Sequence, residues 1–334
     1  MGFSTFKISL IFAFPSIVFG QLKDFNGVDF KKADSTAKQY QGHSLQDIRS
    51  LSLKLTTSLS SDVEKFRAIY RWTCLNIEND PVLFLKNQHK RKKLKSTEAR
   101  DKWNKQLNTI VFETLVKKHK TVCTGYAYLV KELAYHAGLN CEIVDGYGRT
   151  AAANIGGTGV INHSWNAVQL NGKWYLCDPT WSSGAVDMEK RIFIKNYNDA
   201  YFLAEPKLFI RNHYPLDTTW MLVTEKPSLY KFLNRTLIYS SFYDFNIEQV
   251  LPETFNVIIE RGKPLFIQFS QPSDGHTINL IINGPKGVVT LTPQLKKEPN
   301  GLNMIEHSFS SKGLHTLHVL LNSSYVFTYS VLVK

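Results

Sequence analysis

The sequence predicts a chain in two parts, first a mixture of helices and antiparallel strands and then a β-sandwich. Apolar residues recur at helical spacing in the first half, and one pair of strands meets at the hairpin turn Asn171-Gly172. After about Thr224, short strand-like segments alternate with turns, which is typical of a sandwich of about 80 residues. The length of 334 residues suits two domains, and the 43% of hydrophobic residues exclude a disordered chain.

Residues 1–20 are expected to be a secretory signal peptide. Lys7 precedes an apolar run that extends to Phe19, and the segment ends at the positions that a signal peptidase reads, before cleavage after Gly20. The alternative is a membrane anchor, but an apolar run of about 12 residues is short of the ~20 that span a bilayer. We therefore expect a secreted or periplasmic protein with no membrane span and a mature chain that starts at Gln21.

Helices are expected where apolar residues recur at helical spacing, at Ser44–Leu59, Ser61–Ile77 and Cys123–Ala137. In the second of these, Ser61 caps the first turn and Glu64 supports the cap. The third is followed by Gly138, a common residue just beyond a helix end.

Strands are expected on both sides of the hairpin turn and again beyond residue 254. The first group comprises Cys141–Tyr147, Asn166–Leu170 and Lys173–Cys177. The second group lies within Phe255–Phe269, Thr277–Ile282, Val288–Leu291 and Leu314–Leu332.

The segment Lys86–Lys105 holds nine Lys or Arg residues against Glu98 and Asp101. We expect an exposed, partly helical insertion, and its plainest interpretation is a solvated loop. Such a run also attracts anionic surface polymers or nucleic acid. Specific nucleic-acid binding is disfavoured, because Trp103 is the one aromatic residue interleaved with the charges and because the chain is expected to be secreted.

A cysteine, a histidine and an aspartate stand where they can act together. Cys123 begins a predicted helix, where unpaired N–H groups and the helix dipole favour a thiolate. His163 begins the first strand of the hairpin, and Asp178 follows the second. Residues paired across the Asn171-Gly172 turn have numbers that add up to about 343, and those of His163 and Asp178 add up to 341. The imidazole and the carboxylate are therefore expected side by side at the open end of the hairpin.

Each residue alone has a plainer interpretation, as a buried thiol, a hydrogen-bonding histidine and a turn residue. A zinc site is the other chemistry these residue types offer. It is disfavoured because no Cys-x-x-Cys or His-x-x-x-His pair clusters the ligands.

Three motifs resemble those of the transglutaminase-like superfamily: Val122–Ala127, Asn162–Asn166 and Trp174–Trp181. Ala68–Trp72 resembles the helix upstream of that core. The segment from Tyr201 to Trp220, which includes Pro206 and His213-Tyr214-Pro215, is similar to the region that follows the core in the kyphoscoliosis peptidase branch. The resemblance covers roughly residues 45 to 226.

The resemblance implies a papain-like α+β core, with the cysteine helix packed on an antiparallel sheet. It implies a triad of Cys123 as nucleophile, His163 as general base and acid, and Asp178 as the group that orients His163. The chemistry is acyl transfer through a thioester. Water as acceptor gives a peptidase or amidase and an amine gives a transglutaminase, and the motifs do not separate the two.

Two details of the site stay open. The side chain that completes the oxyanion hole is not assigned, and the candidates are Trp103, Gln106 and His119. If Cys123 is free, the remaining cysteines cannot all pair with one another. We expect buried thiols there, with one disulfide left as an alternative, at Cys74, Cys141 and Cys177.

The expected organisation is a signal peptide at 1–20, a transglutaminase-like catalytic domain at 21–226, a junction at 227–253 and an immunoglobulin-like β-sandwich at 254–334. The hypothesis is a secreted cysteine acyl-transfer enzyme that acts on protein or peptide substrates. Hydrolysis is favoured over cross-linking because no DxDxDG calcium loop is present. No cofactor or metal is expected. The alternative is a non-catalytic surface scaffold that retains the fold and binds a partner.

Overall fold

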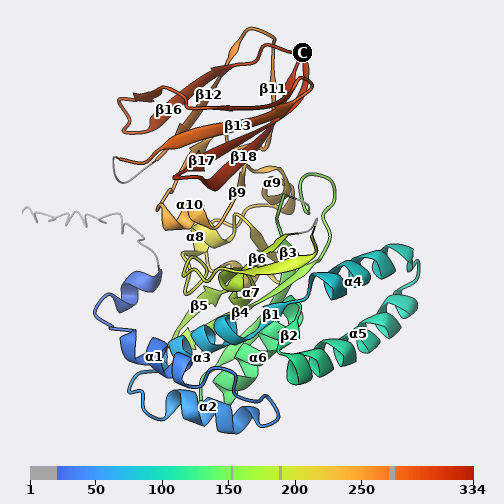
Figure 1. Ribbon diagram of the computed structural model, residues 1–334, viewed down its shortest axis with the longest axis vertical. Coiled ribbons are helices and arrows are strands. Elements are labelled where there is room, and N and C mark those ends of the chain that lie inside the picture. The colour runs from blue at the N-terminus through green and yellow to red at the C-terminus, as the bar shows by residue number, and fades with distance from the viewer. Residues whose placement is uncertain (1–20, 152, 188–189, 271–274) are drawn as a thin grey trace, which may run out of the picture.

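The computed structural model describes residues 21–151, 153–187, 190–270 and 275–334. The proposed signal peptide at 1–20 lies outside the described residues. Figure 1 shows three layers along the long axis: a helical layer that contains α1, α2, α3 and α6, a central antiparallel sheet, and a pair of C-terminal sheets at the opposite end. The mixed core followed by an all-β region is the predicted fold class.

The helical layer is built from α1 (Lys31–Gln39), α2 (Ile48–Thr56), α3 (Asp62–Asn76) and α6 (Cys123–His136). The last three confirm the predicted helices. Ser61 and Glu64 form the expected capping box at the start of α3, so two backbone donors at the helix end are satisfied. Buried Arg67 of α3 pairs with Asp34 of α1 at 2.7 Å and also with Asp199, which ties α1 and α3 to the segment after the Trp174–Trp181 motif.

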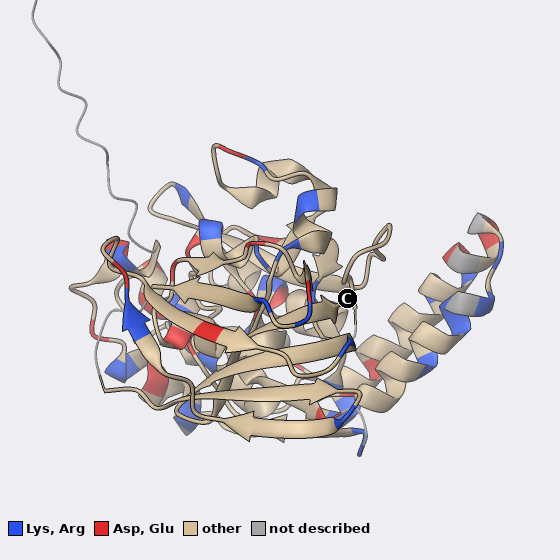
Figure 2. Ribbon diagram, turned by 90° about the horizontal axis from the view of Figure 1, so that it is seen from above, with Lys and Arg blue, Asp and Glu red and all other residues tan. Residues whose placement is uncertain are grey.

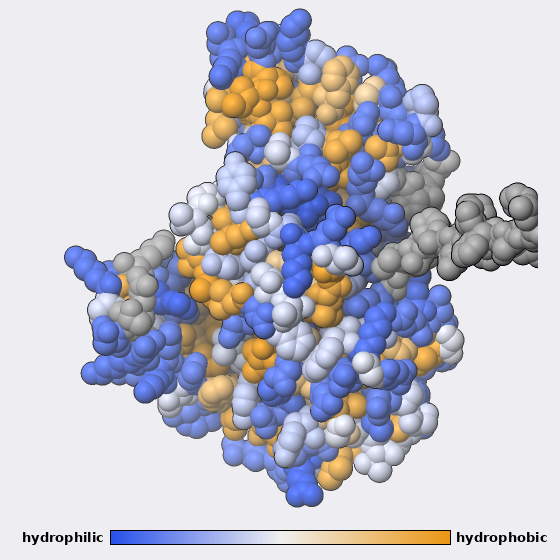
Figure 3. Space-filling view, turned by 180° about the vertical axis from the view of Figure 1, so that it is seen from behind, coloured by the Kyte–Doolittle hydropathy of each residue, from blue (hydrophilic) through white to orange (hydrophobic). Residues whose placement is uncertain are grey.

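The basic segment forms a helical hairpin of α4 (Pro81–Lys93) and α5 (Thr97–Lys118). It is more helical than the sequence indicated, because its apolar residues form a small core together with Val122, which precedes α6. The hairpin residues of this core are Leu83, Trp103, Leu107 and Val111. The hairpin projects from the body of the protein, and Lys and Arg residues line both of its helices (Figure 2). Hydrophilic residues dominate its surface (Figure 3).

The central sheet has the order β5-β4-β3-β8, and all its neighbours are antiparallel. Its strands are β3 (Cys141–Gly148), β4 (His163–Leu170), β5 (Lys173–Cys177) and β8 (His213–Pro215). Asn166 pairs with Cys177 and Leu170 with Lys173, which is the register predicted from the Asn171-Gly172 turn. Helix α6 packs against β3 and β4, so the sheet carries the helix that begins at Cys123.

The C-terminal region consists of two facing sheets with the orders β10-β12-β16-β15 and β11-β18-β17-β13-β14, the latter extended by β9 beside β18. The predicted strands are present. Those of this region are β9 (Leu237–Ile238), β10 (Val250–Leu251), β11 (Asn256–Ile259), β12 (Pro264–Phe269), β13 (Ile278–Gly284), β14 (Gly287–Leu291), β15 (Leu295–Lys297), β16 (Asn303–Ser308), β17 (Gly313–Leu321) and β18 (Ser324–Val333).

Short elements connect these layers. They are η1 (Gln21–Phe25), β1 (Glu78–Asn79), β2 (Lys120–Thr121), α7 (Pro179–Ser183), β6 (Gly184–Asp187), β7 (Ile192–Lys195), α8 (Pro206–Phe209), η2 (Thr218–Met221), α9 (Leu229–Asn234) and α10 (Ser241–Asp244). No helix among the described residues is both long and apolar enough to cross a membrane.

Candidate active site

Cys123 is the first residue of α6, and its side chain is half-buried. Only Val122 separates it from β2, which pairs in parallel with β1, so a strand fixes the entry into the helix. A Cβ atom on Gly125 would lie 2.0 Å from Thr121 Oγ1, so only glycine lets the first turn of α6 approach the end of β2 this closely. The sequence thus holds the sulfur at a helix N-terminus, where the first backbone N–H groups have no partner within the helix.

His163 is the first residue of β4 and is 7% exposed. Its Nε2 lies 2.6 Å from Asp178 Oδ2, and its ring stacks on Trp181 with centroids 4.9 Å apart. A Cβ atom on Gly148 would lie 2.8 Å from His163 Cβ, so this glycine of β3 makes room for the histidine. Because Nε2 is taken by Asp178, Nδ1 is the nitrogen left to face Cys123, which is among the groups that raise the pKa of His163. The Cys123 thiol itself contacts the Asn162 carbonyl, next to His163, at 4.0 Å.

Asp178 is completely buried and precedes α7. Its Oδ1 accepts hydrogen bonds from the backbone N–H groups of Thr180 (2.8 Å) and Trp181 (3.2 Å). The Tyr70 hydroxyl of α3 donates to the Asp178 backbone carbonyl at 2.8 Å. The helix cap therefore fixes which carboxylate oxygen faces the histidine, and α3 fixes the backbone beneath it.

A second histidine shares this carboxylate. His213 is completely buried at the start of β8, and its Nε2 lies 2.9 Å from the same Oδ2 of Asp178. Its other nitrogen, Nδ1, lies 2.7 Å from Asn212 Oδ1, and its ring stacks on Phe209 at 3.9 Å. Sequence reasoning did not assign it to the site, because β8 joins the sheet from a position 35 residues beyond Asp178.

The shared carboxylate drives the pKa values of the two histidines apart. Burial by itself lowers the pKa of His163, but the charge and hydrogen bond of Asp178, with Cys123, raise it to about 10. Burial lowers the pKa of His213 to about 4, although Asp178 acts in the opposite direction. Burial would raise the pKa of Asp178, but His163 and His213 hold it well below its usual range. At neutral pH the site therefore has an ionised aspartate, a protonated His163 and a neutral His213.

Ligand atoms of His163, Asp178 and His213 all lie within 4.8 Å of one another, which is a spacing found in metal sites. The two nitrogen–oxygen distances of 2.6 and 2.9 Å are hydrogen-bond lengths. A metal ion between these atoms would need them farther apart, since each ligand bond is ~2.0–2.2 Å long. The distances instead fit a triad of Cys123, His163 and Asp178 in which His213 makes an additional hydrogen bond to Asp178.

Among the described residues, none of the three oxyanion-hole candidates hydrogen-bonds to Cys123, whose thiol contacts the Asn162 carbonyl. Trp103 donates its Nε1–H to Asn87 within the helical hairpin, and Gln106 is exposed on α5. His119 ends α5 and packs edge-on against Trp72 at 6.2 Å. The backbone N–H groups at the start of α6 are therefore the donors best placed for a developing oxyanion.

All four cysteines are free thiols, as the sequence led us to expect for Cys74, Cys141 and Cys177. These three are buried, and burial raises the pKa of each thiol. The disulfide that the sequence left open is not formed. Cys123 is the thiol that solvent reaches.

We expect iodoacetamide at neutral pH to alkylate Cys123 well before the other three cysteines, because alkylation needs an accessible thiolate. Peptide mass spectrometry over a time course measures the four rates. A Cys123→Ser protein should stay unlabelled over the same period until it is denatured. Equal rates at all four positions in the native protein would remove the basis for a reactive Cys123.

Comparison with known proteins agrees with the resemblance to the transglutaminase-like superfamily. The sequence profile of the transglutaminase-like superfamily matches residues 49–179, a range that contains Cys123, His163 and Asp178. Kyphoscoliosis peptidase of Mus musculus is 34% identical over 236 residues, which are 70% of this chain and 33% of that protein, and the Homo sapiens protein matches to the same extent.

Hillarin of Drosophila melanogaster is 26% identical over 233 residues, which are 66% of this chain and 26% of that protein. The chain spans about a third of the length of the kyphoscoliosis peptidases that it matches. Residues 49–179 are therefore a domain of the transglutaminase-like superfamily, in a chain related to kyphoscoliosis peptidase.

Proposed function

We propose that this chain is a secreted cysteine-dependent acyl-transfer enzyme that acts on peptide or isopeptide bonds. The observation that carries the proposal is the buried His163–Asp178 pair beside a half-exposed cysteine at a helix N-terminus. A scaffold has no need of a histidine whose pKa is raised next to a cysteine. The leader-like sequence of residues 1–20 supports secretion.

The reaction follows from the atoms present. The Cys123 sulfur attacks the carbonyl carbon of the amide, and backbone N–H groups of α6 stabilise the oxyanion. His163 donates its proton to the amine nitrogen as the C–N bond breaks, which leaves a thioester on Cys123. His163 then takes a proton from water or from a second amine, whose attack on the thioester releases the acyl product and the thiolate.

Hydrolysis is favoured over amine transfer. The name of the mouse and human relatives is that of a peptidase, and a DxDxDG calcium loop is missing from the sequence. The surroundings of the thioester determine whether water or an amine accepts the acyl group. The reaction products therefore distinguish hydrolysis from amine transfer.

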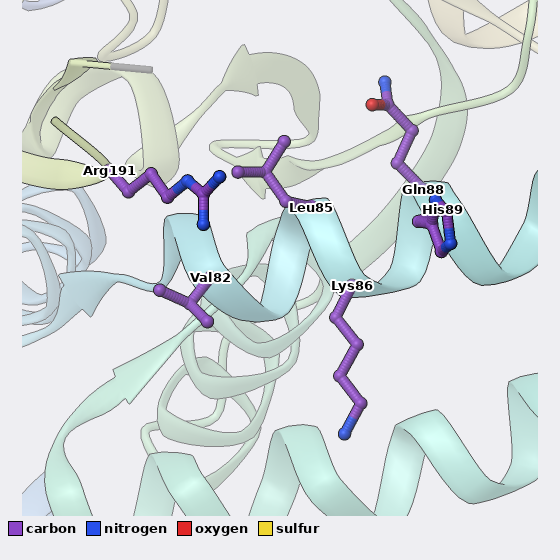
Figure 4. A pocket seen from close by; sticks show the side chains of 6 residues that line it. All are labelled: Val82, Leu85, Lys86, Gln88, His89 and Arg191. Carbon is purple, nitrogen blue, oxygen red and sulfur yellow. The ribbon is translucent and has the colours of Figure 1, made fainter. Parts of the chain in front are cut away.

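The basic helical hairpin suggests that the binding partner is anionic. A hollow of about 520 Å³ lies beside α4 and is lined by the basic side chains of Lys86, His89 and Arg191 together with Val82, Leu85 and Gln88. Figure 4 shows Arg191 reaching toward α4 from the loop before β7, near Val82 and Leu85. The hollow has three basic and no acidic side chains, so an acidic segment of a substrate or an anionic surface polymer suits it.

The test is mass spectrometry of a peptide library after incubation with the protein and with its Cys123→Ala variant. We expect cleaved or deamidated peptides from the unsubstituted chain and none from the variant, because the variant has no nucleophile. Amine-linked products would identify a transglutaminase instead. Identical product profiles for the two proteins would favour the non-catalytic scaffold.

A further inference from the structure

Three arginines lie close together where the central sheet meets the C-terminal region. Arg149 directly follows β3, Arg211 lies two residues before β8, and Arg235 directly follows α9. Arg149 is 1% exposed and Arg211 is 5% exposed, whereas Arg235 is half-buried. Figure 1 shows α9 and β9 between the two regions. None of the three residues has a role in the proposed reaction.

Hydrogen bonds of Arg149 join the three chain segments. Its backbone N–H donates to the carbonyl of Asn212 at 2.8 Å, next to Arg211. Its Nη1 donates to the carbonyl of Thr236 at 3.1 Å, next to Arg235. Arg149 is thus held between the neighbours of the other two arginines.

The cluster has more donors than acceptors. Four buried nitrogen atoms have no hydrogen-bond partner, and they are Arg149 Nη2, Arg211 Nε, Arg211 Nη2 and Arg235 Nε. Buried donors are nearly always paired, because an unpaired one has lost its bond to water without replacing it. Four unpaired donors on three neighbouring guanidinium groups therefore point to an acceptor that all three groups share.

The cluster also has excess positive charge. Burial lowers the pKa of Arg149 to about 9, and the charges of Arg211 and Arg235 contribute to this. Burial and Arg235 lower the pKa of Arg211 to about 10. All three groups remain cations at neutral pH. The carboxylate that acts on Arg211 and Arg235 is that of Glu253, which is exposed and lies 3.7 Å from Lys231 Nζ.

We propose that Arg149, Arg211 and Arg235 form a binding site for a small dianionic oxyanion, phosphate or sulfate. A tetrahedral dianion offers several acceptor oxygens to the N–H forks of guanidinium groups and offsets two of the three charges. Arg149 and Arg211 are nearly completely buried and Arg235 is the most exposed of the three, which suits a free ion better than an ester on a large molecule. The ion would join β3, the segment before β8 and the segment after α9.

The experiment measures the thermal unfolding midpoint of the full chain in inorganic phosphate, in sulfate and in sodium chloride of equal ionic strength. Phosphate or sulfate should raise the midpoint above the chloride value, by on the order of 4 °C at about a hundredfold excess over Kd. Arg235→Gln should lose this rise, because it removes the solvent-side fork while leaving the two buried arginines. Arg261→Gln, a matched substitution at an exposed turn before β12, should keep it.

A fourth anion, phenyl phosphate, distinguishes a free phosphate ion from a phosphate ester. A rise with phenyl phosphate alone would overturn the assignment to a free ion. Equal midpoints in phosphate, sulfate and chloride would overturn the site itself, as would an undiminished rise in Arg235→Gln. If Arg235→Gln does not fold, Arg235→Lys keeps the charge without the fork, and it should bind phosphate at least fivefold more weakly by calorimetry, at about one ion per chain.

Discussion

Replacement of Asp178 by asparagine should lower the rate of acyl transfer on the order of 10⁴-fold with little change in structure. In the native chain Oδ1 accepts the N–H groups of Thr180 and Trp181, while Oδ2 faces both histidines. The helix cap requires an oxygen on the Oδ1 side, so the asparagine NH2 group must face the histidines. His163 Nε2 then meets a donor and cannot hold its proton. The imidazolium that protonates the leaving amine is lost.

The measurement is kcat on a peptide identified by the library experiment, with circular dichroism to show that the variant is folded. Asp145→Asn is the matched control, because this carboxylate lies in the same sheet, accepts the Ser164 hydroxyl at 2.6 Å and is exposed. It should keep activity within about twofold. A folded Asp178→Asn protein with full activity would show that His163 needs no orienting carboxylate, and the triad assignment would be wrong.

The local part of the candidate site could be predicted from the sequence. The Asn171-Gly172 turn sets the register of β4 and β5, and that register places His163 beside Asp178. The helix that begins at Cys123 follows from its apolar stripe. These features depend on neighbours in sequence, whose backbone geometry limits the alternatives.

Contacts between distant segments could not be predicted in the same way. His213 reaches Asp178 because β8 pairs with β3, and no pattern near His213 encodes that pairing. The strand β16 (Asn303–Ser308) has weak alternation and forms because it lies between β12 and β15. The arginine cluster likewise joins three segments that are far apart in the chain.

The junction between the two regions illustrates the same limit. We propose the divisions 21–226, 227–253 and 254–334 as structural regions, but one buried apolar cluster contains side chains from both sides of residue 226. Val144, Trp165 and Phe209, which precede residue 226, belong to the same buried cluster as Phe242 and Ile267, which follow it. The boundary read from the sequence is therefore not expected to be a boundary of folding.

A chain truncated after Lys226 should fail to fold stably. The Tyr243 hydroxyl donates to the Leu208 carbonyl at 2.8 Å, and its ring packs on Tyr201 at 5.3 Å. Phe232 packs on Tyr214 at 5.3 Å, at the strand that carries His213. Each large apolar side chain that loses its cover costs ~1.5–3 kcal/mol, and several together exceed a total stability of ~5–15 kcal/mol.

Circular dichroism and thermal unfolding of the chains 21–226 and 21–334 measure this loss, with the longer chain as the control. We expect a cooperative transition only from the longer chain. Cys123 alkylation adds a second readout, because an unfolded 21–226 chain should label all four cysteines alike, whereas the 21–334 chain should label Cys123 first. A 21–226 chain that unfolds cooperatively and still labels at Cys123 alone would show that residues 21–226 fold by themselves. The shared core would then be an interface between two independent domains rather than part of what holds His213 against Asp178.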